Sequence, residues 1–329
     1  MKKINKIISV ALSISIIAGA LVGCGSKEAD NTGNKVGNQN KIEDKNNKEE
    51  KNENVLINEE YKVNAQWLSE NINDENIVVI DARAEKAYLK GHIPGAISVP
   101  WQSLSKMEGK NSDKGWGTVL DKEELEKKLG ELGINNDKTM VAYCDTTASW
   151  GDDGRIVWML QVAGIENAKI LDGGVKAWNS LKLDMATDRV SKEAVEFKIT
   201  NEDKSSTINT EDLAKNLSTY KIIDTRAKVE YEGAQKYGEL RGGHITGAIN
   251  IPFNTLVDEK GMLKSPEEIE KIMRDNGINR EDEIVTYCTA GIRSAHMAVV
   301  LKMIGYENVK NYDESIYTWA ADENLDMEK

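Results

Sequence analysis

The stretch Ile284-Val285-Thr286-Tyr287-Cys288-Thr289-Ala290-Gly291-Ile292-Arg293 decides the fold of this chain of 329 residues. Its β-branched beginning predicts a short strand, which ends before Cys288 and delivers that cysteine into a tight loop. Apolar residues then recur at helical spacing as far as Ile304, and Gly305 follows as a helix stop. The sequence therefore predicts a strand, a short loop and a helix, with a cysteine at the strand end.

The same pattern occurs twice in the chain. The first copy of this strand end is Val141-Ala142-Tyr143-Cys144, and other motifs return in the same order, so coincidence is implausible. These pairs are IVVIDAR at 77–83 with IIDTR at 222–226, GHIPGAI at 91–97 with GHITGAI at 243–249, and Trp178 with Trp319. Short β-branched runs alternate with helical segments in each copy, which predicts an α/β fold of two tandem domains with parallel strands joined by helices. We expect the two tryptophans to pack in the core.

The N-terminus has the layout of an export signal. Lysines precede an apolar run from Ile7 to Ala20, and Leu21-Val22-Gly23-Cys24 resembles the bacterial lipobox. Roughly 15 apolar residues are fewer than the ~20 that a membrane-spanning helix needs. We therefore expect residues 1–23 to be a lipoprotein signal peptide and Cys24 to carry the lipid that anchors an extracytoplasmic protein to the bacterial cell membrane.

Composition separates a tether from the globular part. Residues 24–54 are rich in Lys, Asn, Glu and Asp and almost free of apolar side chains, which predicts a disordered linker after the lipidated cysteine. The whole chain has 43 Lys and Arg against 55 Asp and Glu, a formal net charge of −12. No basic surplus is available to follow a phosphate backbone, so nucleic-acid binding is disfavoured.

The surroundings expected around Cys288 favour a reactive thiolate. The inward N–H groups of a tight loop and the free amides of a helix N-terminus carry partial positive charge. Together with Arg293, they lower the pKa of a thiol, and the thiolate is the nucleophilic form. Gly291 suits such a loop because glycine tolerates a positive φ.

These motifs together resemble the rhodanese family, also known as the thiosulfate sulfurtransferases. The resemblance rests on Asp-x-Arg after a strand, on Gly-His-Ile-x-Gly-Ala, and on the loop that runs from Cys288 to Arg293. It implies a central parallel sheet flanked by helices in each of two domains, 55–185 and 206–329, with the second one catalytic. A charged stretch at about 184–206 is the expected linker between them.

The resemblance also implies a chemistry and its residues. Cys288 matches the nucleophile that takes sulfane sulfur from thiosulfate, holds it as a persulfide and passes it to cyanide or a thiol. The matching cradle of loop amides and side chain is Thr289, Ala290, Gly291, Ile292 and Arg293. The expected partners are thus a small-molecule sulfur donor and a thiophilic acceptor, with no cofactor and with a monomer as the expected state.

Other polar residues near these motifs have separate expected roles. Arg241 is the second candidate cation for an anionic donor. Asp224, Arg226 and His244 are expected to fix loops near the site. The three cysteines and three histidines of the chain are too scattered to predict a metal site.

The first copy departs from this pattern at its cysteine loop. The loop after Cys144 is three residues longer than the loop after Cys288 and carries Asp145, Asp152 and Asp153. Negative neighbours raise the pKa of a thiol, so we expect the first copy to be catalytically degenerate. We also expect the two cysteines to remain unpaired.

Several functional alternatives stay open at this point. Glu230 stands where the tandem enzymes tend to carry an arginine for substrate, which counts against 3-mercaptopyruvate as the donor without excluding it. A phosphatase-like loop is disfavoured, because only four residues separate Cys288 from Arg293 where that class has five. A sulfane-sulfur carrier, sensor or binding module at the membrane surface is the non-catalytic alternative.

Overall fold

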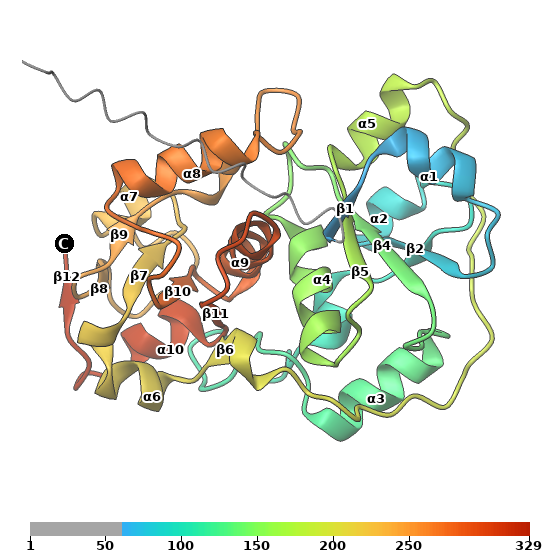
Figure 1. Ribbon diagram of the computed structural model, residues 1–329. Helices are drawn as coiled ribbons and strands as arrows, with labels where there is room; N and C mark the ends of the chain where they lie inside the picture. Colours follow the sequence, from blue (N-terminus) through green and yellow to red (C-terminus); the bar gives the residue numbers. More distant parts are fainter. Residues whose placement is uncertain (1–60) are drawn as a thin grey trace, which may run out of the picture. The chain divides into compact units, whose positions relative to one another are not determined.

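The computed structural model describes residues 61–329, and each sequence copy forms one five-stranded parallel sheet with helices on both faces (Figure 1). The predicted signal peptide, Cys24 and the linker to residue 54 lie outside the described residues. Within them, none of the helices has the length and apolar character to span a bilayer.

In the first copy, the strand order is β1-β5-β4-β2-β3, and every neighbouring pair is parallel. The elements are β1 (Lys62–Val63), α1 (Ala65–Asn71), β2 (Ile77–Asp81), α2 (Glu85–Tyr88), β3 (Ile97–Ser98), the 3-10 turn η2 (Trp101–Leu104), α3 (Lys122–Glu131), β4 (Thr139–Tyr143), α4 (Asp152–Val162), β5 (Ala168–Leu171) and α5 (Gly174–Ser180).

The second copy repeats this topology as β6-β11-β10-β7-β9, again with parallel neighbours. Its elements are η3 (Lys204–Ser206), β6 (Thr207–Ile208), α6 (Thr210–Lys215), η4 (Leu217–Thr219), β7 (Lys221–Asp224), α7 (Lys228–Tyr231), β8 (His244–Ile245), β9 (Ile249–Asn250), η5 (Phe253–Leu256), α8 (Pro266–Asp275), β10 (Ile284–Tyr287), α9 (Ile292–Met303), β11 (Val309–Tyr312), α10 (Ser315–Ala321) and β12 (Met327–Glu328). The last strand, β12, pairs antiparallel with β8.

Successive side chains of the central strands point to opposite faces of the sheet, which explains why helices cover both faces. In β2, Val78 and Ile80 join the core beneath α3 and α4, whereas Ile77 and Val79 join the core beneath α1 and α5. A parallel sheet buried on both faces needs nearly continuous apolar strands, which the sequence supplies. The matched tryptophans Trp178 and Trp319 are buried in the equivalent cores of the two copies, as their pairing predicts.

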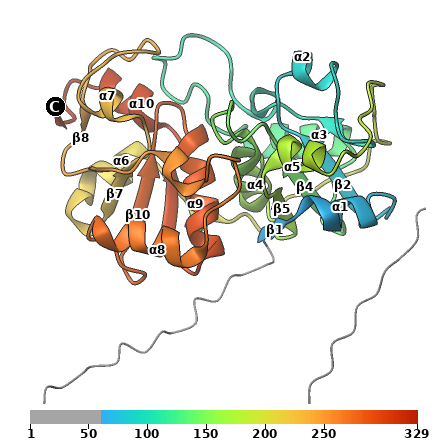
Figure 2. The same cartoon turned by 90° about the horizontal axis from the view of Figure 1, so that it is seen from above.

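The two copies share a tightly packed boundary. Helices α4 and α9, which follow the two cysteine loops, lie side by side in both ribbon views (Figure 1, Figure 2). Ala295 and Val299 of α9 belong to the buried core of the first copy. The stretch expected to link the copies also packs on the first one, because Phe197 and Ile199 are buried in that same core. The fold therefore places the cysteine loop of the second copy directly against the first copy.

Candidate active site

The cysteine loop of the second copy has the expected local structure. Strand β10 ends at Tyr287, and Gly291 precedes the first residue of α9 with φ +79°. A Cβ atom at Gly291 would collide with the Asp313 carboxylate and crowd the Arg155 guanidinium. Glycine is thus required there both for its backbone conformation and for space.

Cys288 is buried at the N-terminus of α9, and its surroundings favour the thiolate form. Burial disfavours the thiolate, but Arg293, the N–H groups of Ser294 and Ala290 and the Ser294 hydroxyl together lower the pKa of Cys288 below its usual range. Ser294 was not among the expected cradle residues. Its backbone N–H and its hydroxyl both contribute to the lowered pKa of Cys288.

Arg293 is held by a carboxylate within the site. Its two terminal nitrogens donate to the two oxygens of Glu230 at 2.8 and 2.9 Å, and one of them also donates to the Thr289 hydroxyl at 2.6 Å. All three side chains are buried. Burial opposes the charge on Glu230, yet Arg293 keeps the pKa of this carboxyl below its usual range. Arg293 closes the loop as expected, but its charge is largely balanced by Glu230.

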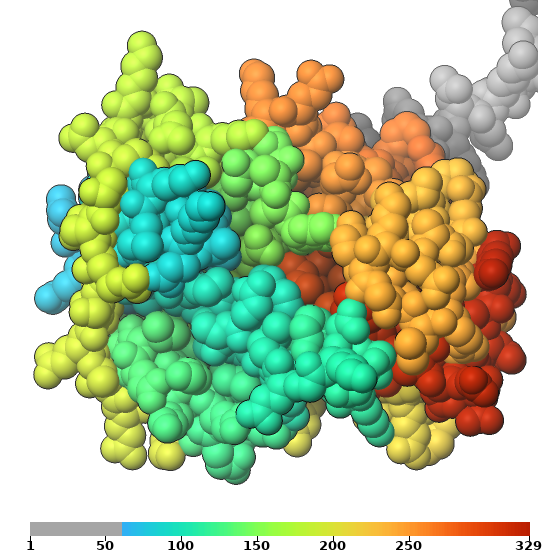
Figure 3. Space-filling view, turned by 180° about the vertical axis from the view of Figure 1, so that it is seen from behind, coloured from blue at the N-terminus to red at the C-terminus, as the bar shows by residue number. Residues whose placement is uncertain are grey.

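A cavity of about 310 Å³ lies in front of Cys288. The space-filling view shows a recess on this face, where green and teal segments of the first copy meet the gold segment of the second above dark orange atoms (Figure 3). Besides the cysteine loop, its walls are largely aromatic: Trp101, Trp116, Trp150, Tyr237 and Tyr317. Both copies contribute, so the site is complete only at their boundary.

The longer loop of the first copy forms part of this wall. Trp150 stands over the Arg293 guanidinium at 4.6 Å and packs edge to face on Tyr237 with ring centroids 5.0 Å apart. Asp152, the first residue of α4, also lines the cavity. Burial and the neighbouring Asp153 raise the pKa of Asp152 to about 7. The loop after Cys144 was predicted to form a degenerate site, and the structure adds that two of its residues line the cavity in front of Cys288.

Arg155 of α4 connects the first copy to the active loop. Its side chain is fully buried, pairs with Asp313 and donates to the Gly291 carbonyl at 3.2 Å and the Gly117 carbonyl at 3.0 Å. Asp313 also accepts from the Val119 amide at 2.9 Å. The sequence gives no local motif for Arg155, since only the packing of α4 against α9 brings it to the loop.

Ser315 supports the nucleophile from behind. Its hydroxyl accepts a hydrogen bond from the Cys288 amide at 3.2 Å and donates one to the Tyr312 carbonyl at 2.8 Å. Ser315 has φ +51°, close to the +53° of Gly174 at the matched position of the first copy. A side chain in the left-handed region costs roughly 1–3 kcal/mol, so Ser315 is held there by its surroundings.

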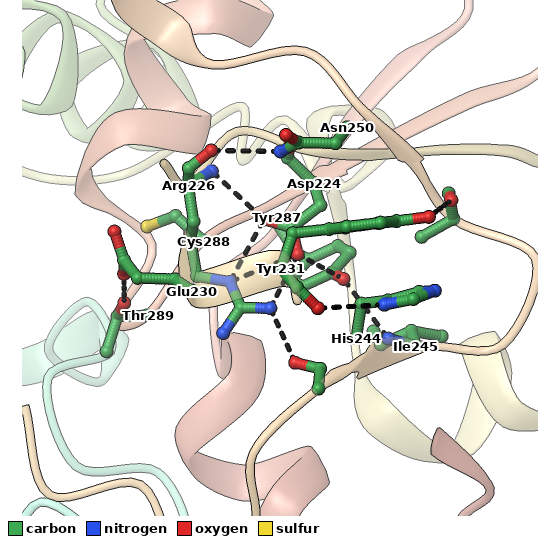
Figure 4. A network of polar contacts seen from close by, with 12 residues as sticks. Asp224, Arg226, Glu230, Tyr231, His244, Ile245, Asn250, Tyr287, Cys288 and Thr289 are labelled. Carbon is green, nitrogen blue, oxygen red and sulfur yellow. Dashed lines mark hydrogen bonds and ion pairs between the residues drawn. The ribbon is translucent and has the colours of Figure 1, made fainter. Parts of the chain in front are cut away.

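Asp224, Arg226 and His244 belong to one network of polar contacts beside Cys288 (Figure 4). Arg226 pairs with Asp224 and donates to the Gly243 carbonyl at 2.7 Å, and the Tyr287 hydroxyl donates to Asp224 at 2.7 Å. The His244 ring stacks on Tyr231 with centroids 3.6 Å apart, and its Nδ1 lies 3.0 Å from the Tyr231 carbonyl oxygen. This network fixes the strand end that precedes Cys288. The first copy repeats it with Asp81, Arg83, Tyr143, Tyr88 and His92.

Arg241 does not reach the cavity, which corrects the expectation that it is a second substrate cation. Its guanidinium donates to the backbone carbonyls of Trp319, Ala320, Asp322 and Leu325 at 2.6–2.9 Å. These acceptors lie at and beyond the C-terminal end of α10, where unpaired carbonyls attract a cation. Arg241 is therefore a cap for the C-terminal segment.

Cys144 lies beside carboxylates where Cys288 lies beside Arg293. Burial, Asp153 and Asp152 raise its pKa well above the usual range, as the acidic loop predicts. Both cysteines are free thiols. Within residues 61–329, no group of three or more His, Cys, Asp and Glu side chains is arranged to hold a metal ion.

Comparison with known proteins identifies the family of this chain. Residues 64–181 and 209–322 match the model of the rhodanese-like domain, within the predicted ranges 55–185 and 206–329. The chain is 31% identical to the 3-mercaptopyruvate sulfurtransferase of Escherichia coli over 286 residues, which cover 81% of this chain and 97% of that protein. It is 30% identical to a Mycobacterium leprae protein named provisionally as a thiosulfate sulfurtransferase, over 77% of this chain and 92% of that one.

Two further similarities concern a sulfur carrier and a solved structure. The sulfur carrier protein TtuD of Thermus thermophilus is 30% identical over 275 residues, or 78% of this chain and 92% of TtuD. The anaerobic ergothioneine biosynthesis enzyme of Chlorobium limicola, solved with trimethyl histidine, has a TM-score of 0.74 at 23% identity, covering 82% of this chain and 70% of that one. The second likeness shows the fold alone. With two matched domains and relatives of this identity, the chain belongs to the rhodanese family of sulfurtransferases and carries two tandem rhodanese-like domains.

Proposed function

We propose that the protein is a thiosulfate sulfurtransferase that works through a persulfide on Cys288. The Cys288 thiolate attacks the outer sulfur of thiosulfate, and the sulfur–sulfur bond of the donor breaks with its electron pair leaving on sulfite. The outer sulfur then moves from Cys288 to an acceptor such as cyanide or a thiol. No external oxidant or reductant is needed, because sulfane sulfur is transferred at one oxidation level.

One observation carries this proposal: the pKa of Cys288 is lowered at the base of an open cavity. Three kinds of donor face the sulfur, namely two backbone N–H groups, the Ser294 hydroxyl and the Arg293 charge. The same donors stabilise the negative charge on a persulfide as it forms and breaks. Cys144 also faces the Ser149 hydroxyl, at 3.0 Å, and the Asp153 N–H, but burial and the carboxylates of Asp153 and Asp152 outweigh these donors.

The lining of the cavity favours thiosulfate over 3-mercaptopyruvate as the donor. A carboxylate donor needs a cation of its own at a distance from the nucleophile. Arg293 is the one cationic side chain among the described residues that line the cavity, and it already pairs with Glu230. Thiosulfate needs no second binding group and can use the loop amides next to Cys288.

Intact mass of the full chain tests the proposal. Thiosulfate should add the mass of one sulfur atom, and cyanide should remove it. Cys144→Ser should retain the adduct and Cys288→Ser should lose it. An adduct on Cys144 in place of Cys288, or none on either, would refute the assignment. Steady release of sulfite and thiocyanate would distinguish an enzyme from a carrier that is loaded once.

We further propose that the protein acts outside the cytoplasm, held to the membrane by a lipid on Cys24. The support is the basic start, the apolar run and the Leu21-Val22-Gly23-Cys24 motif. A Cys24→Ser variant should lose incorporation of labelled fatty acid and leave the membrane fraction. Retention of both in this variant would overturn the anchor.

A further inference from the structure

The cavity in front of Cys288 has more apolar surface than a thiosulfate ion or a cyanide molecule requires. At about 310 Å³, it lies at the small end of the range, roughly 300–1,000 Å³, in which proteins bind organic ligands. Five aromatic side chains line it, and Trp116 packs edge to face on Tyr317 with centroids 5.6 Å apart. Such rings offer a face to an organic group rather than to a small hydrated anion.

The charges around the cavity favour a cation. Arg293 is neutralised by Glu230, while the sulfur of Cys288 is negative both as a thiolate and as a persulfide. Asp152 adds a carboxyl group to the wall and makes no ion pair with any residue in 61–329. Away from the loop amides that face Cys288, a positive charge would therefore be attracted to both the Asp152 carboxyl group and the aromatic faces.

Asp152 reaches the cavity from the first copy. It comes from the first turn of α4 in the first copy, at the end of the cysteine loop that is longer than its counterpart. Asp153 beside it points elsewhere and faces His296 of α9 at 3.3 Å. Of these two acidic residues, only Asp152 lines the cavity in front of Cys288.

We propose that this cavity binds a cationic organic thiol as the sulfur acceptor, with the aromatic walls around its positive charge and Asp152 facing that charge. The inference rests on the persulfide of the proposed function. The acceptor thiol loses its proton to solvent, and its sulfur forms a bond to the outer sulfur of the persulfide. The bond from that sulfur to Sγ of Cys288 breaks, its electron pair stays on Sγ, and the acceptor leaves as a persulfide.

Binding can be measured without any sulfur transfer. Choline and its uncharged isostere 3,3-dimethylbutan-1-ol are titrated into the full chain while tryptophan fluorescence is followed. We expect choline to bind roughly tenfold more tightly, the scale of one cation–π contact with a carboxylate nearby. Asp152→Asn should remove most of this preference, and Asp145→Asn should retain it. Asp145 is a matched control because it lies on the same loop, outside the cavity lining, and pairs with Lys176.

Transfer is then measured with thiocholine and its uncharged isostere 3,3-dimethylbutane-1-thiol. Loading Cys288 with inorganic polysulfide, checked by intact mass, makes this step independent of thiosulfate as donor. The ratio of the two single-turnover rates should fall roughly tenfold in Asp152→Asn relative to wild type, and the intrinsic reactivity of each thiol cancels in that comparison.

The outcomes separate the two proposals. If polysulfide leaves no adduct on Cys288, the proposed function and this acceptor fail together. If the adduct forms but choline binds no better than its isostere, or Asp152→Asn slows both thiols equally, only the cationic acceptor is refuted.

Discussion

Glu230 holds both terminal nitrogens of Arg293, at 2.8 and 2.9 Å, directly beside the nucleophilic cysteine loop. The arginine that lowers the pKa of Cys288 is therefore shared between a thiol and a carboxylate. This arrangement fixes the guanidinium in a buried position, where an unpaired charge would be costly. It also reduces the attraction that the site offers to an anionic donor.

Replacing Glu230 by glutamine should strengthen the binding of thiosulfate. The amide keeps a hydrogen-bond acceptor for Arg293 but removes the compensating negative charge. We expect KM for thiosulfate to fall several-fold, about 1 kcal/mol of electrostatic free energy at a partly screened site. Steady-state kinetics at low and moderate salt would measure this change. Because the effect is electrostatic, it should shrink at high salt, and an unchanged or higher KM at low salt would contradict it.

The two cysteines should react with alkylating agents at very different rates. The pKa of Cys288 lies below the usual thiol range because Arg293 and the donors of the loop outweigh the effect of burial. The pKa of Cys144 lies well above that range because burial and two carboxylates act together. In Cys144→Ser, the rate of carbamidomethylation should reach half its maximum below pH 8.5, the value for a free thiol.

The companion variant Cys288→Ser provides the control for this measurement. Its remaining Cys144 should stay unmodified in the folded chain over the same pH range and become reactive after unfolding. Rapid modification of folded Cys144 would show that the acidic loop does not suppress its reactivity.

Sequence reasoning predicted what depends on local pattern. The duplicated strands, the helix after Cys288 and the glycine at 291 follow from residue periodicity and turn chemistry, and the structure contains each of them. The carboxylate partner of Arg293 was not predicted, since Glu230 lies 63 positions earlier in the chain.

Long-range packing decided the rest of the site. Trp150, Asp152 and Arg155 reach the second copy only because α4 packs against α9. The greater length of the loop after Cys144 was the one sequence feature that could have indicated this. Its acidic residues predicted loss of activity in the first copy, but they did not predict that the loop would line the cavity of the second. Arg241 was misassigned for the converse reason. It is close in sequence to the Gly-His-Ile motif, but its hydrogen bonds hold the guanidinium at the C-terminal end of α10.

Removal of Arg155 should uncouple the active loop from the first copy. Arg155→Met retains an unbranched apolar stem but loses the pairing with Asp313 and the bonds to the Gly291 and Gly117 carbonyls. Breaking a buried pair from one side costs roughly 3–5 kcal/mol, so we expect a lower free energy of unfolding. Sulfur transfer should fall more than tenfold under conditions where the variant remains folded.

A second variant separates loop positioning from stability. Asp313→Asn leaves Arg155 its carbonyl acceptors and should have an intermediate effect on both quantities. Rates that are equal to wild type in folded Arg155→Met would show that the loop holds its conformation without this side chain.

Asp152 should make the folded protein less stable as the pH rises. Burial and Asp153 raise its pKa from 3.8 to about 7, while His296 lowers it in part. Between these two values the folded state holds a proton that the unfolded chain releases, so the free energy of unfolding falls with increasing pH and levels off above about pH 7. Asp152→Asn should therefore exceed wild type in stability by about 4 kcal/mol at pH 8, and this difference should disappear at pH values below about 3.8.

Chemical denaturation of the full chain at a series of pH values would measure this difference, with Asp145→Asn as the control for loss of one charge from the same loop. A stability difference independent of pH would mean that Asp152 is not protonated by folding.

If the expected dependence is found, the first copy maintains a destabilising carboxyl group in the wall of a cavity that belongs to the second copy. Natural proteins retain a destabilising residue where function requires it. The stability lost at Asp152 would then be explained by its role in binding the acceptor at Cys288.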